Sequence, residues 1–179
     1  MRCRIRRIAD RDWDDVVALE AAAYRARGLS EAREVLESRG RASPATSFVL
    51  DIDGRVAGYL LALPYPRFRC PDPRRAERTA YASPDLHLHD LVVRADLRGA
   101  GHGGRLLRHL TATATPHGYR HLSLVAVAGS GRFWAAHGFR PHPEVPLPGA
   151  YGAGAVYLSR PLDHGHPTRE VDPHAGAAR

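Results

Sequence analysis

The sequence predicts a single domain of the α/β (α+β) class, with helices and strands in one compact unit. Three neighbouring segments favour it. An apolar run over 86–93 is rich in residues that favour strands, and a glycine-dense turn follows over 98–104. Apolar side chains then recur at helical spacing at Leu106, Leu107 and Leu110. A length of 179 residues suits one domain, which we place at residues 1–162.

The N-terminal segment predicts a strand followed by a helix. Residues 3–9 read as the strand. Asp10 or Asp12 can cap the helix, which we expect to continue to about Arg25. The apolar side of this helix consists of Val16, Val17, Leu19, Ala23 and Tyr24.

A second, shorter helix is expected after a brief connection. Ser30 can begin it, Glu34 lies nearby, and the helix should end at about Ser38. The following stretch over 39–45, with the sequence RGRASPA, has the composition of a loop.

The clearest local prediction is a hairpin. Residues 47–52 and 55–63 read as two strands, and the Asp53-Gly54 pair between them is typical of a tight turn. A long connection rich in proline and arginine follows over 64–84, and connections of this length are usually functional or mobile. Its aromatic residues either line a ligand pocket or pack the loop onto the body; they are Tyr65, Phe68 and Tyr81.

The C-terminal part predicts alternating short elements. Residues 115–118 end the central helix, 121–127 form a buried strand, and Ser130 caps a short helix through His137. The last strands are expected around Val145 and Leu147 and over 155–158.

Residues 163–179 are polar, contain prolines and lack any period, so we expect a disordered tail. Three histidines lie there, at His164, His166 and His174, without a fixed set of other ligands. We therefore expect no metal site.

The strand, the glycine turn and the helix together predict a site for a phosphate group. Glycines let the backbone approach a ligand closely, and the N-terminus of a helix adds partial positive charge. A dinucleotide site would place Gly99 at the strand end and an acidic residue about twenty positions further on. Residues 94–98 intervene instead, and 119–128 contains no Asp or Glu. A P-loop requires a lysine, and the chain has none.

The pattern Arg98-x-x-Gly101-x-Gly103, directly after a strand that ends at Val93, resembles the acetyl-CoA-binding motif of the GNAT N-acetyltransferase superfamily. The segment 130–139 (SGRFWAAHGF) is similar to that family's short helix with a Gly-Phe ending. The resemblance covers roughly residues 3–162. It implies a mixed, mostly antiparallel central sheet flanked by helices. It also implies that acetyl-CoA is the co-substrate.

By this resemblance, backbone amides of the turn wrap the CoA pyrophosphate, and the preceding strand binds the pantetheine arm. The implied cofactor-binding residues are Leu91, Val92, Val93, Arg98, Gly99, Ala100, Gly101, His102, Gly103, Gly104, Ser130 and Trp134.

The central strand carries the candidate catalytic groups. In a regular strand His87, His89, Leu91 and Val93 share one face, and Leu88, Asp90 and Val92 share the other. Two histidines on one face can relay the proton that an amine must lose, since an imidazole titrates near neutral pH. The arrangement resembles the paired histidines of the arylalkylamine (serotonin) N-acetyltransferase branch. The alternative is a pair of half-buried histidines hydrogen-bonded to their neighbours.

Two acidic residues have structural alternatives. Asp90 faces away from the histidines in a regular strand, so a structural role is expected for it. Glu20, on the inner side of the first helix, either neutralises a cationic amine or lies exposed on the helix surface.

The sequence departs from the family at the proton donor. Family members usually place a tyrosine four residues before the glycine of Gly-Phe, and its hydroxyl protonates the leaving thiolate. Trp134 occupies that position here and cannot serve as an acid. Tyr157, Ser130 and water remain as alternatives, and Tyr151 is the residue that we favour as the donor.

We therefore expect an acetyl-CoA-dependent N-acetyltransferase that acetylates a primary amine of a small molecule by direct attack in a ternary complex. The alternative is an acyl-CoA-binding sensor or partner module without transfer.

The net charge of +7 and the pI of about 10.1 raise the question of nucleic acid. All 26 basic residues are arginines and are scattered, so we expect no nucleic acid partner. No apolar run approaches the length of a membrane span. Cys3 and Cys70 lack metal-ligand spacing, which favours a reduced cytoplasm. A homodimer is possible.

Overall fold

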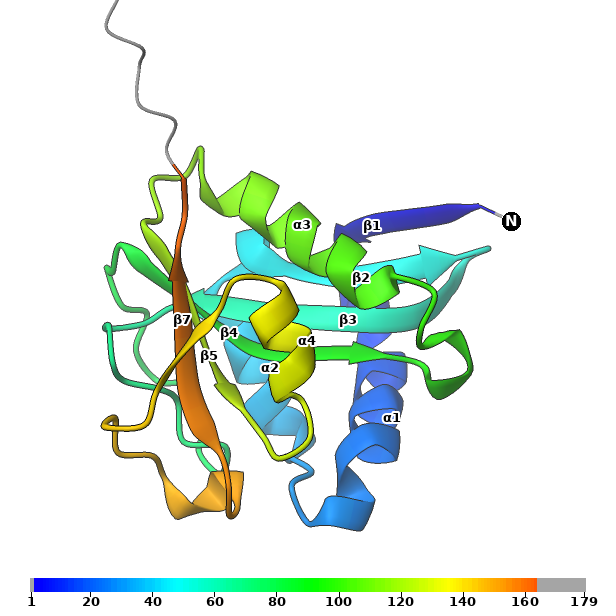
Figure 1. Ribbon diagram of the computed structural model, residues 1–179. Coiled ribbons are helices and arrows are strands. Elements are labelled where there is room, and N and C mark those ends of the chain that lie inside the picture. The colour runs from blue at the N-terminus through cyan, green and yellow to red at the C-terminus, as the bar shows by residue number, and fades with distance from the viewer. Residues whose placement is uncertain (1, 164–179) are drawn as a thin grey trace, which may run out of the picture.

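The computed structural model describes residues 2–163, and these form one seven-stranded sheet in the order β1-β2-β3-β4-β5-β7-β6. Neighbouring strands are antiparallel except β4 and β5, which are parallel (Figure 1). The predicted mixed, mostly antiparallel sheet is confirmed. The strands are β1 (Cys3–Arg7), β2 (Ser47–Ile52), β3 (Arg55–Pro64), β4 (Asp85–Val93), β5 (His121–Ala126), β6 (Arg140–His142) and β7 (Val156–Pro161).

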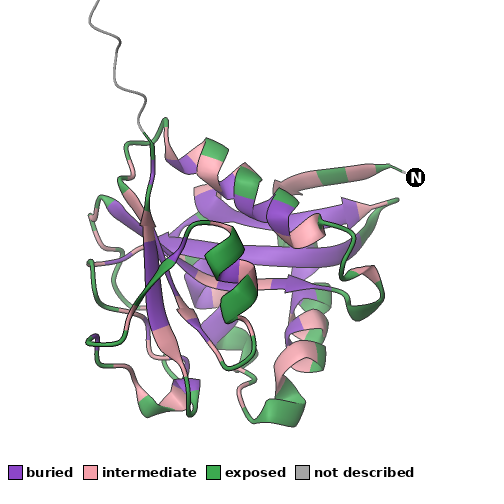
Figure 2. Ribbon diagram, in the orientation of Figure 1, coloured by how far each residue is buried: buried purple, intermediate pink, exposed green. Residues whose placement is uncertain are grey.

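Helices cover both faces of the sheet and give it two apolar cores. Helices α1 (Trp13–Tyr24) and α2 (Arg33–Ala42) pack on one face, where Val16 and Leu36 meet Tyr59. Helices α3 (His102–Ala114) and α4 (Gly131–Ala136) pack on the other, where Leu106 and Trp134 join the larger core. Figure 2 shows the central strands as the most continuously buried part of the chain. Burial on both faces explains why β3 is apolar along nearly its whole length.

The parallel pair β4–β5 is short, and this positions the site. Only residues 85–87 of β4 pair with 121–123 of β5. Beyond His87, β4 continues along β3 while β5 continues along β7, so the two central strands diverge. Helix α3 makes the crossover that two parallel strands require. The sheet therefore opens at its centre, beside the N-terminus of α3.

A β-bulge in β4 changes which side chains share a face. Ala62 pairs with Leu88 and Leu61 pairs with Asp90, so His89 is the extra residue. Leu88 packs with the α3 core, whereas Asp90 accepts hydrogen bonds from Tyr24 and Tyr59 on the α1 side.

The regular alternation expected for β4 is therefore wrong beyond the bulge. The polar residues His89 and Asp90 lie on one face although they are consecutive. Leu91 and Val93 lie on the opposite face, with the α3 core, and do not share a face with His89. The expected separation of Asp90 from the histidines is wrong for the same reason.

The hairpin of β2 and β3 is confirmed, but the helix before it begins and ends later in the sequence than predicted. Helix α2 begins at Arg33 and ends at Ala42, so the loop expected over 39–45 is wrong. Arg39 is fully buried and ion-paired, and Gly40 lies against the ring of Trp13. Tertiary packing thus overrides a loop-like composition. Ser30 does not begin this helix. Its hydroxyl instead donates a hydrogen bond to the buried carboxylate of Glu20.

Among the described residues, neither α1 nor α4 has the side-chain cap that we expected at its N-terminus. The Asp12 carboxylate pairs with Arg6 and accepts the Ala9 N–H, and it does not cap α1. The Ser130 hydroxyl donates to the Val127 carbonyl at 2.8 Å and does not cap α4.

The last strands also differ from the prediction. They are 140–142 and 156–161, whereas Val145 and Leu147 lie outside any strand. The stretch expected to be a tail, apart from Asp163, and its three histidines lie outside the described residues.

Gly40 gives a test of the α1–α2 contact. A Cβ built there lies 2.6 Å from a ring carbon of Trp13, so Gly40→Ala overpacks the interface. We expect Gly40→Ala to lower the free energy of unfolding by about 1–3 kcal/mol, measured by urea denaturation. The control Gly131→Ala, in a helix and with open space around its Cβ, should be neutral or slightly stabilising. Equal stabilities of the two variants would contradict this packing.

Candidate functional site

A groove of about 510 Å³ lies at the N-terminus of α3. The first N–H groups of a helix have no partner within the helix, so those of α3 are available to a ligand beside this turn. Partial positive charge at the same end favours an anion. The lining residues are Leu91, Val93, Leu97, Arg98, Gly99, Gly101, His102, Gly103, Gly104, Ser130, Phe133 and Trp134.

The glycines of this turn serve two different purposes. Gly99 and Gly101 have φ angles of +81° and +79°, a region that other residues rarely adopt. A Cβ on Gly103 would lie 3.3 Å from the ring of Phe133, and one on Gly104 would lie 3.1 Å from His137. The first two glycines therefore allow the turn, and the last two let α3 approach α4 closely.

A second cavity, of about 110 Å³, lies where β4 and β5 diverge. It shares Leu91, Ser130 and Trp134 with the groove, so the two spaces adjoin. More than half of its wall is apolar, and its polar groups include Glu31, His89 and Asp90. The lining residues are Tyr24, Leu29, Glu31, Pro73, Leu88, His89, Asp90, Leu91, Leu124, Val125, Val127, Ser130, Trp134, Ala150 and Tyr151.

Two contacts join distant segments of the chain near this cavity. A Cβ built on Gly152 lies 3.5 Å from Leu29 Cδ2, so the segment after the 3-10 turn at 149–151 approaches the connection between α1 and α2. Arg27 donates from Nη2 to the carbonyl oxygen of Ala128 at 2.5 Å. These contacts hold together the segments whose residues Leu29, Ala150 and Tyr151 line the cavity.

His89 and Glu31 form a polar pair that lines the cavity. His89 Nε2 and Glu31 Oε2 lie 2.6 Å apart, and both side chains are almost completely buried. Burial lowers the pKa of His89, and the neighbouring Glu31 only partly offsets this. His89 is therefore a neutral imidazole at neutral pH. Its other nitrogen, Nδ1, has no partner among the described residues.

Asp90 is a buried carboxyl group that lines the same cavity. The Tyr24 hydroxyl donates to it at 2.8 Å, and the Tyr59 hydroxyl donates to its other oxygen. Burial raises the pKa of Asp90 to about 7, although the two tyrosine hydrogen bonds act in the opposite direction. Its proton is therefore gained and lost near physiological pH.

His87 lies behind the cavity and does not line it. Its Nδ1 lies 3.0 Å from the Ser123 hydroxyl, and its ring lies beside Tyr65 and Tyr157. Burial holds the pKa of His87 well below its usual value, so the ring stays neutral. The bulge and the end of the β4–β5 pairing thus separate the two predicted histidines: one reaches the cavity and the other packs behind it.

The acetyltransferase (GNAT) family model matches residues 13–139 of the sequence. The chain belongs to the GNAT acetyltransferase family. The match includes both the glycine turn and the Gly-Phe ending on which the resemblance was based, and it confirms that resemblance. Among curated protein sequences, none matches this chain.

Solved structures of GNAT proteins share the fold. The loading GNATL domain of CurA from Lyngbya majuscula is 16% identical, with a TM-score of 0.75 over 92% of this chain and 100% of that one. Ard1 from Thermoplasma volcanium is 15% identical, with a TM-score of 0.71 over 90% of this chain and 99% of that one.

N-acetylglutamate synthase from Neisseria gonorrhoeae, solved with coenzyme A and N-acetyl-glutamate, is 22% identical with a TM-score of 0.69. The alignment covers 91% of this chain and 36% of that protein. At these identities the likeness concerns the fold alone.

Ten of the twelve cofactor-binding residues expected from the GNAT motif line the groove. Val92 instead packs with the α1–α2 core, since the bulge reverses its face, and Ala100 is exposed at the turn. Leu97 and Phe133 line the groove and were missed. Both are apolar residues beside the motif, and the motif alone carries no signal for them.

Tyr151, the residue that we favoured as the proton donor, lines the inner cavity, but its hydroxyl already has a partner. It donates to the carbonyl oxygen of Pro71 at 2.8 Å. Burial raises the pKa of Tyr151 well above its usual value. Trp134 packs edge-on against Phe133 and Phe139 between the two spaces.

The remaining candidates take structural positions. Glu20 is buried, not exposed on the helix, and accepts the Ser30 hydroxyl and the Glu31 N–H. Tyr65 packs edge-on against Tyr81, and Phe68 packs edge-on against His142. The aromatic residues of the long connection therefore pack it onto the body, and Pro73 is its residue in the cavity wall.

The most important residues that sequence reasoning missed are Glu31 and Arg39. Arg39 lay in a stretch read as loop, and an arginine there usually points to solvent. Only the fold shows that it lies 2.9 Å from Glu31 and 2.6 Å from Glu77.

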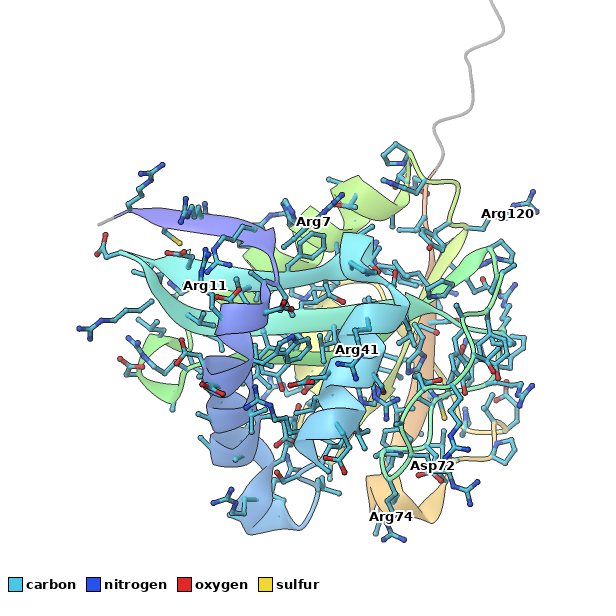
Figure 3. All side chains as sticks on the ribbon, turned by 180° about the vertical axis from the view of Figure 1, so that it is seen from behind. Arg7, Arg11, Arg41, Asp72, Arg74 and Arg120 are labelled. Carbon is cyan, nitrogen blue, oxygen red and sulfur yellow. The ribbon has the colours of Figure 1, made fainter. Side chains whose placement is uncertain are left out.

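Arg98 lines the groove, whereas several other surface arginines lie elsewhere on the chain. Figure 3 shows Arg7, Arg11, Arg41, Arg74 and Arg120 extending from separate parts of the chain. Within residues 2–163, no helix is both long and apolar enough to cross a membrane. The same residues hold no group of three or more His, Cys, Asp or Glu side chains suited to a metal ion.

Asp90 predicts a specific pH dependence of stability. Its pKa rises from an ordinary 3.8 to about 7 on folding, so the folded chain keeps a proton that the unfolded chain has lost. Stability is therefore lost as pH rises from about 4 to about 7, by about 4 kcal/mol. Asp90→Asn should remove this slope in denaturant unfolding at pH 5 and pH 8.

The control for this prediction is Asp96→Asn, at an exposed carboxylate paired with Arg94. It should keep the slope of the wild type. If Asp90→Asn and the wild type lose stability in parallel as pH rises, the carboxyl group of Asp90 does not titrate as described.

Proposed function

We propose that the protein is an acetyl-CoA-dependent N-acetyltransferase that acetylates a primary amine of a small molecule by direct attack in a ternary complex. The observation that carries this proposal is the junction of two spaces at the opening between β4 and β5. One is a groove beside the N-terminus of a helix, and the other is an apolar cavity with His89 and Asp90 at its polar side.

The groove suits the CoA part of the donor. The glycine turn and the first N–H groups of α3 would bind the pyrophosphate, as the GNAT motif implies. The pantetheine arm would lie along Leu91 and Val93 and bring the thioester to Trp134, where the two spaces meet. The related N-acetylglutamate synthase structure holds coenzyme A, which supports this assignment.

The inner cavity suits an amine with an apolar body. Its walls are mainly leucine, valine and aromatic side chains, and its volume of about 110 Å³ favours a small molecule over an extended peptide. Asp90 is negatively charged above pH 7 and would attract the ammonium group of the arriving acceptor.

The reaction needs a proton acceptor and a partner for the leaving sulfur. His89, neutral and at the cavity, would take a proton from the amine nitrogen. His87 would act only from behind, through its neighbours. Tyr151 would donate a hydrogen bond to the leaving sulfur after its hydroxyl leaves Pro71.

Gly101 tests the donor groove. Gly101→Val adds a side chain that faces open space in the groove and strains a φ of +79°, so the dissociation constant for acetyl-CoA should rise at least about tenfold. Isothermal titration calorimetry measures this. Gly118→Val is a matched control with a φ of +82° and open space outside the groove, and it should bind as the wild type does. Equal binding by both variants would exclude the turn as the CoA site.

Turnover tests the transferase. Acetyl-CoA is mixed with a panel of aromatic and aliphatic primary amines, and free thiol release is followed. Since general bases contribute about 10²–10⁴-fold, His89→Gln should lower kcat by at least about 10²-fold without changing acetyl-CoA affinity. The exposed His117, changed to Gln, is the control. Tight acetyl-CoA binding without turnover of any amine would favour the acyl-CoA-binding module instead.

A further inference from the structure

We propose that Glu31 and Arg39 are positioning residues that hold His89 in one tautomer, with the proton on Nε2, so that Nδ1 is the nitrogen that accepts the proton of the amine. This inference rests on the proposed function for the role of Nδ1. Which ring nitrogen of His89 carries the proton does not depend on the proposed function.

The first step concerns the hydrogen bond between His89 and Glu31. Their closest atoms are 2.6 Å apart, and the side chains are 2% and 8% exposed. Burial alone would raise the pKa of Glu31, but His89 and Arg39 together lower it below its ordinary value. A carboxylate only accepts hydrogen bonds, so Nε2 must carry the proton and Nδ1 is left with the lone pair.

The second step concerns Arg39, whose guanidinium is completely buried. It donates to Glu31 at 2.9 Å, to Glu77 at 2.6 Å and to the carbonyl oxygen of Asp72 at 3.0 Å. Arg39 therefore fixes the Glu31 carboxylate from the side opposite His89. It also connects the long 64–84 connection to the cavity.

The third step concerns the backbone that carries Glu31. The buried Glu20 carboxylate accepts the Glu31 N–H at 2.7 Å and the Ser30 hydroxyl at 2.5 Å. Glu31 thus has its main chain and both carboxylate oxygens fixed. A carboxylate held this firmly selects one orientation of the imidazole ring, which a loosely held surface glutamate would not do.

Charges in the cluster affect the pKa of His89 in both directions: Glu31 favours the protonated ring, whereas burial and Arg39 oppose it. With Glu31 and Glu77 ionised, Arg39 leaves the group one negative charge in excess, and a proton on His89 neutralises it. The other titratable groups that line the cavity with His89 include Tyr24, Asp90 and Tyr151, and the ring of His87 lies beside it. All of them are shared by the variants tested below.

The proton balance of the reaction is complete with these groups. The amine enters as ammonium and must lose two protons to become the amide. One moves to His89 Nδ1, directly or through one water, and is then released to solvent. The nitrogen forms the N–C bond while the C–S bond breaks with its electron pair on sulfur. The second nitrogen proton ends on that sulfur as the free thiol.

The test compares Glu31→Gln with Glu37→Gln. Both are glutamate-to-glutamine changes, at the entry to α2 and within it, but Glu37 pairs only with Arg33 and Arg41 near the surface. We expect Glu31→Gln to lower kcat about 10²-fold with the KM for the amine and the affinity for acetyl-CoA nearly unchanged. The acid limb of the pH profile should move to lower pH, because His89 loses the negative charge that favours its protonated form. Glu37→Gln should change none of these.

Nuclear magnetic resonance of ¹⁵N-histidine protein gives a readout that does not need activity. In the wild type the His89 ring should carry its proton on Nε2, and in Glu31→Gln a mixture with the Nδ1–H tautomer should appear. Glu31→Asp keeps the carboxylate and should restore part of the activity and of the tautomer preference.

Three results would overturn the inference. The first is that His89 of the wild type carries its proton on Nδ1. The second is that the tautomer is unchanged in Glu31→Gln. The third is that Glu37→Gln loses as much kcat as Glu31→Gln does. If Glu31→Gln does not fold, the wild-type tautomer still decides. If no amine is acetylated but the His89 tautomer changes in Glu31→Gln, then Glu31 does position His89 and the proposed transferase function is wrong.

Discussion

The buried guanidinium of Arg39 is the interaction on which the arrangement of the cavity depends. An arginine without solvent is unfavourable by several kcal/mol unless its donors are satisfied. Here two carboxylates and one carbonyl oxygen accept hydrogen bonds from its two Nη groups, while its Nε has no partner among the described residues. These acceptors come from the entry to α2 and from the long connection before β4. Each of these segments lacks strands of its own. Because this one buried charge must be paired, the two segments are held close together, and the cavity lies between them.

The bulge in β4 is the second constraint, because it sets which groups face that cavity. A regular strand would direct His89 and Asp90 to opposite faces. The extra residue places both on the side of α1 and α2, while Leu91 and Val93 turn to the other side. One inserted residue thus lets a strand present polar groups to one ligand space and apolar groups to the adjoining groove.

Local signals in the sequence were sufficient for the elements that depend on local chemistry. Asp53-Gly54 marked the hairpin, and the glycines after Val93 marked the turn before α3. The loop assigned to 39–45 was wrong, because composition does not show that Gly40 fits under Trp13. His89 was found from its strand pattern. Glu31 was not found, because its partner is 58 positions away and only the fold brings them together.

Trp134, which replaces the expected tyrosine, gives the molecule a built-in optical probe. The chain has two tryptophans, and Trp13 lies in the core between α1, α2 and the sheet. Trp134 instead borders both the groove and the inner cavity. The emission of an indole depends on the polarity around it, so a ligand in either space changes the fluorescence of Trp134 while that of Trp13 stays constant. Occupancy of the site is therefore readable from intrinsic fluorescence, without a label.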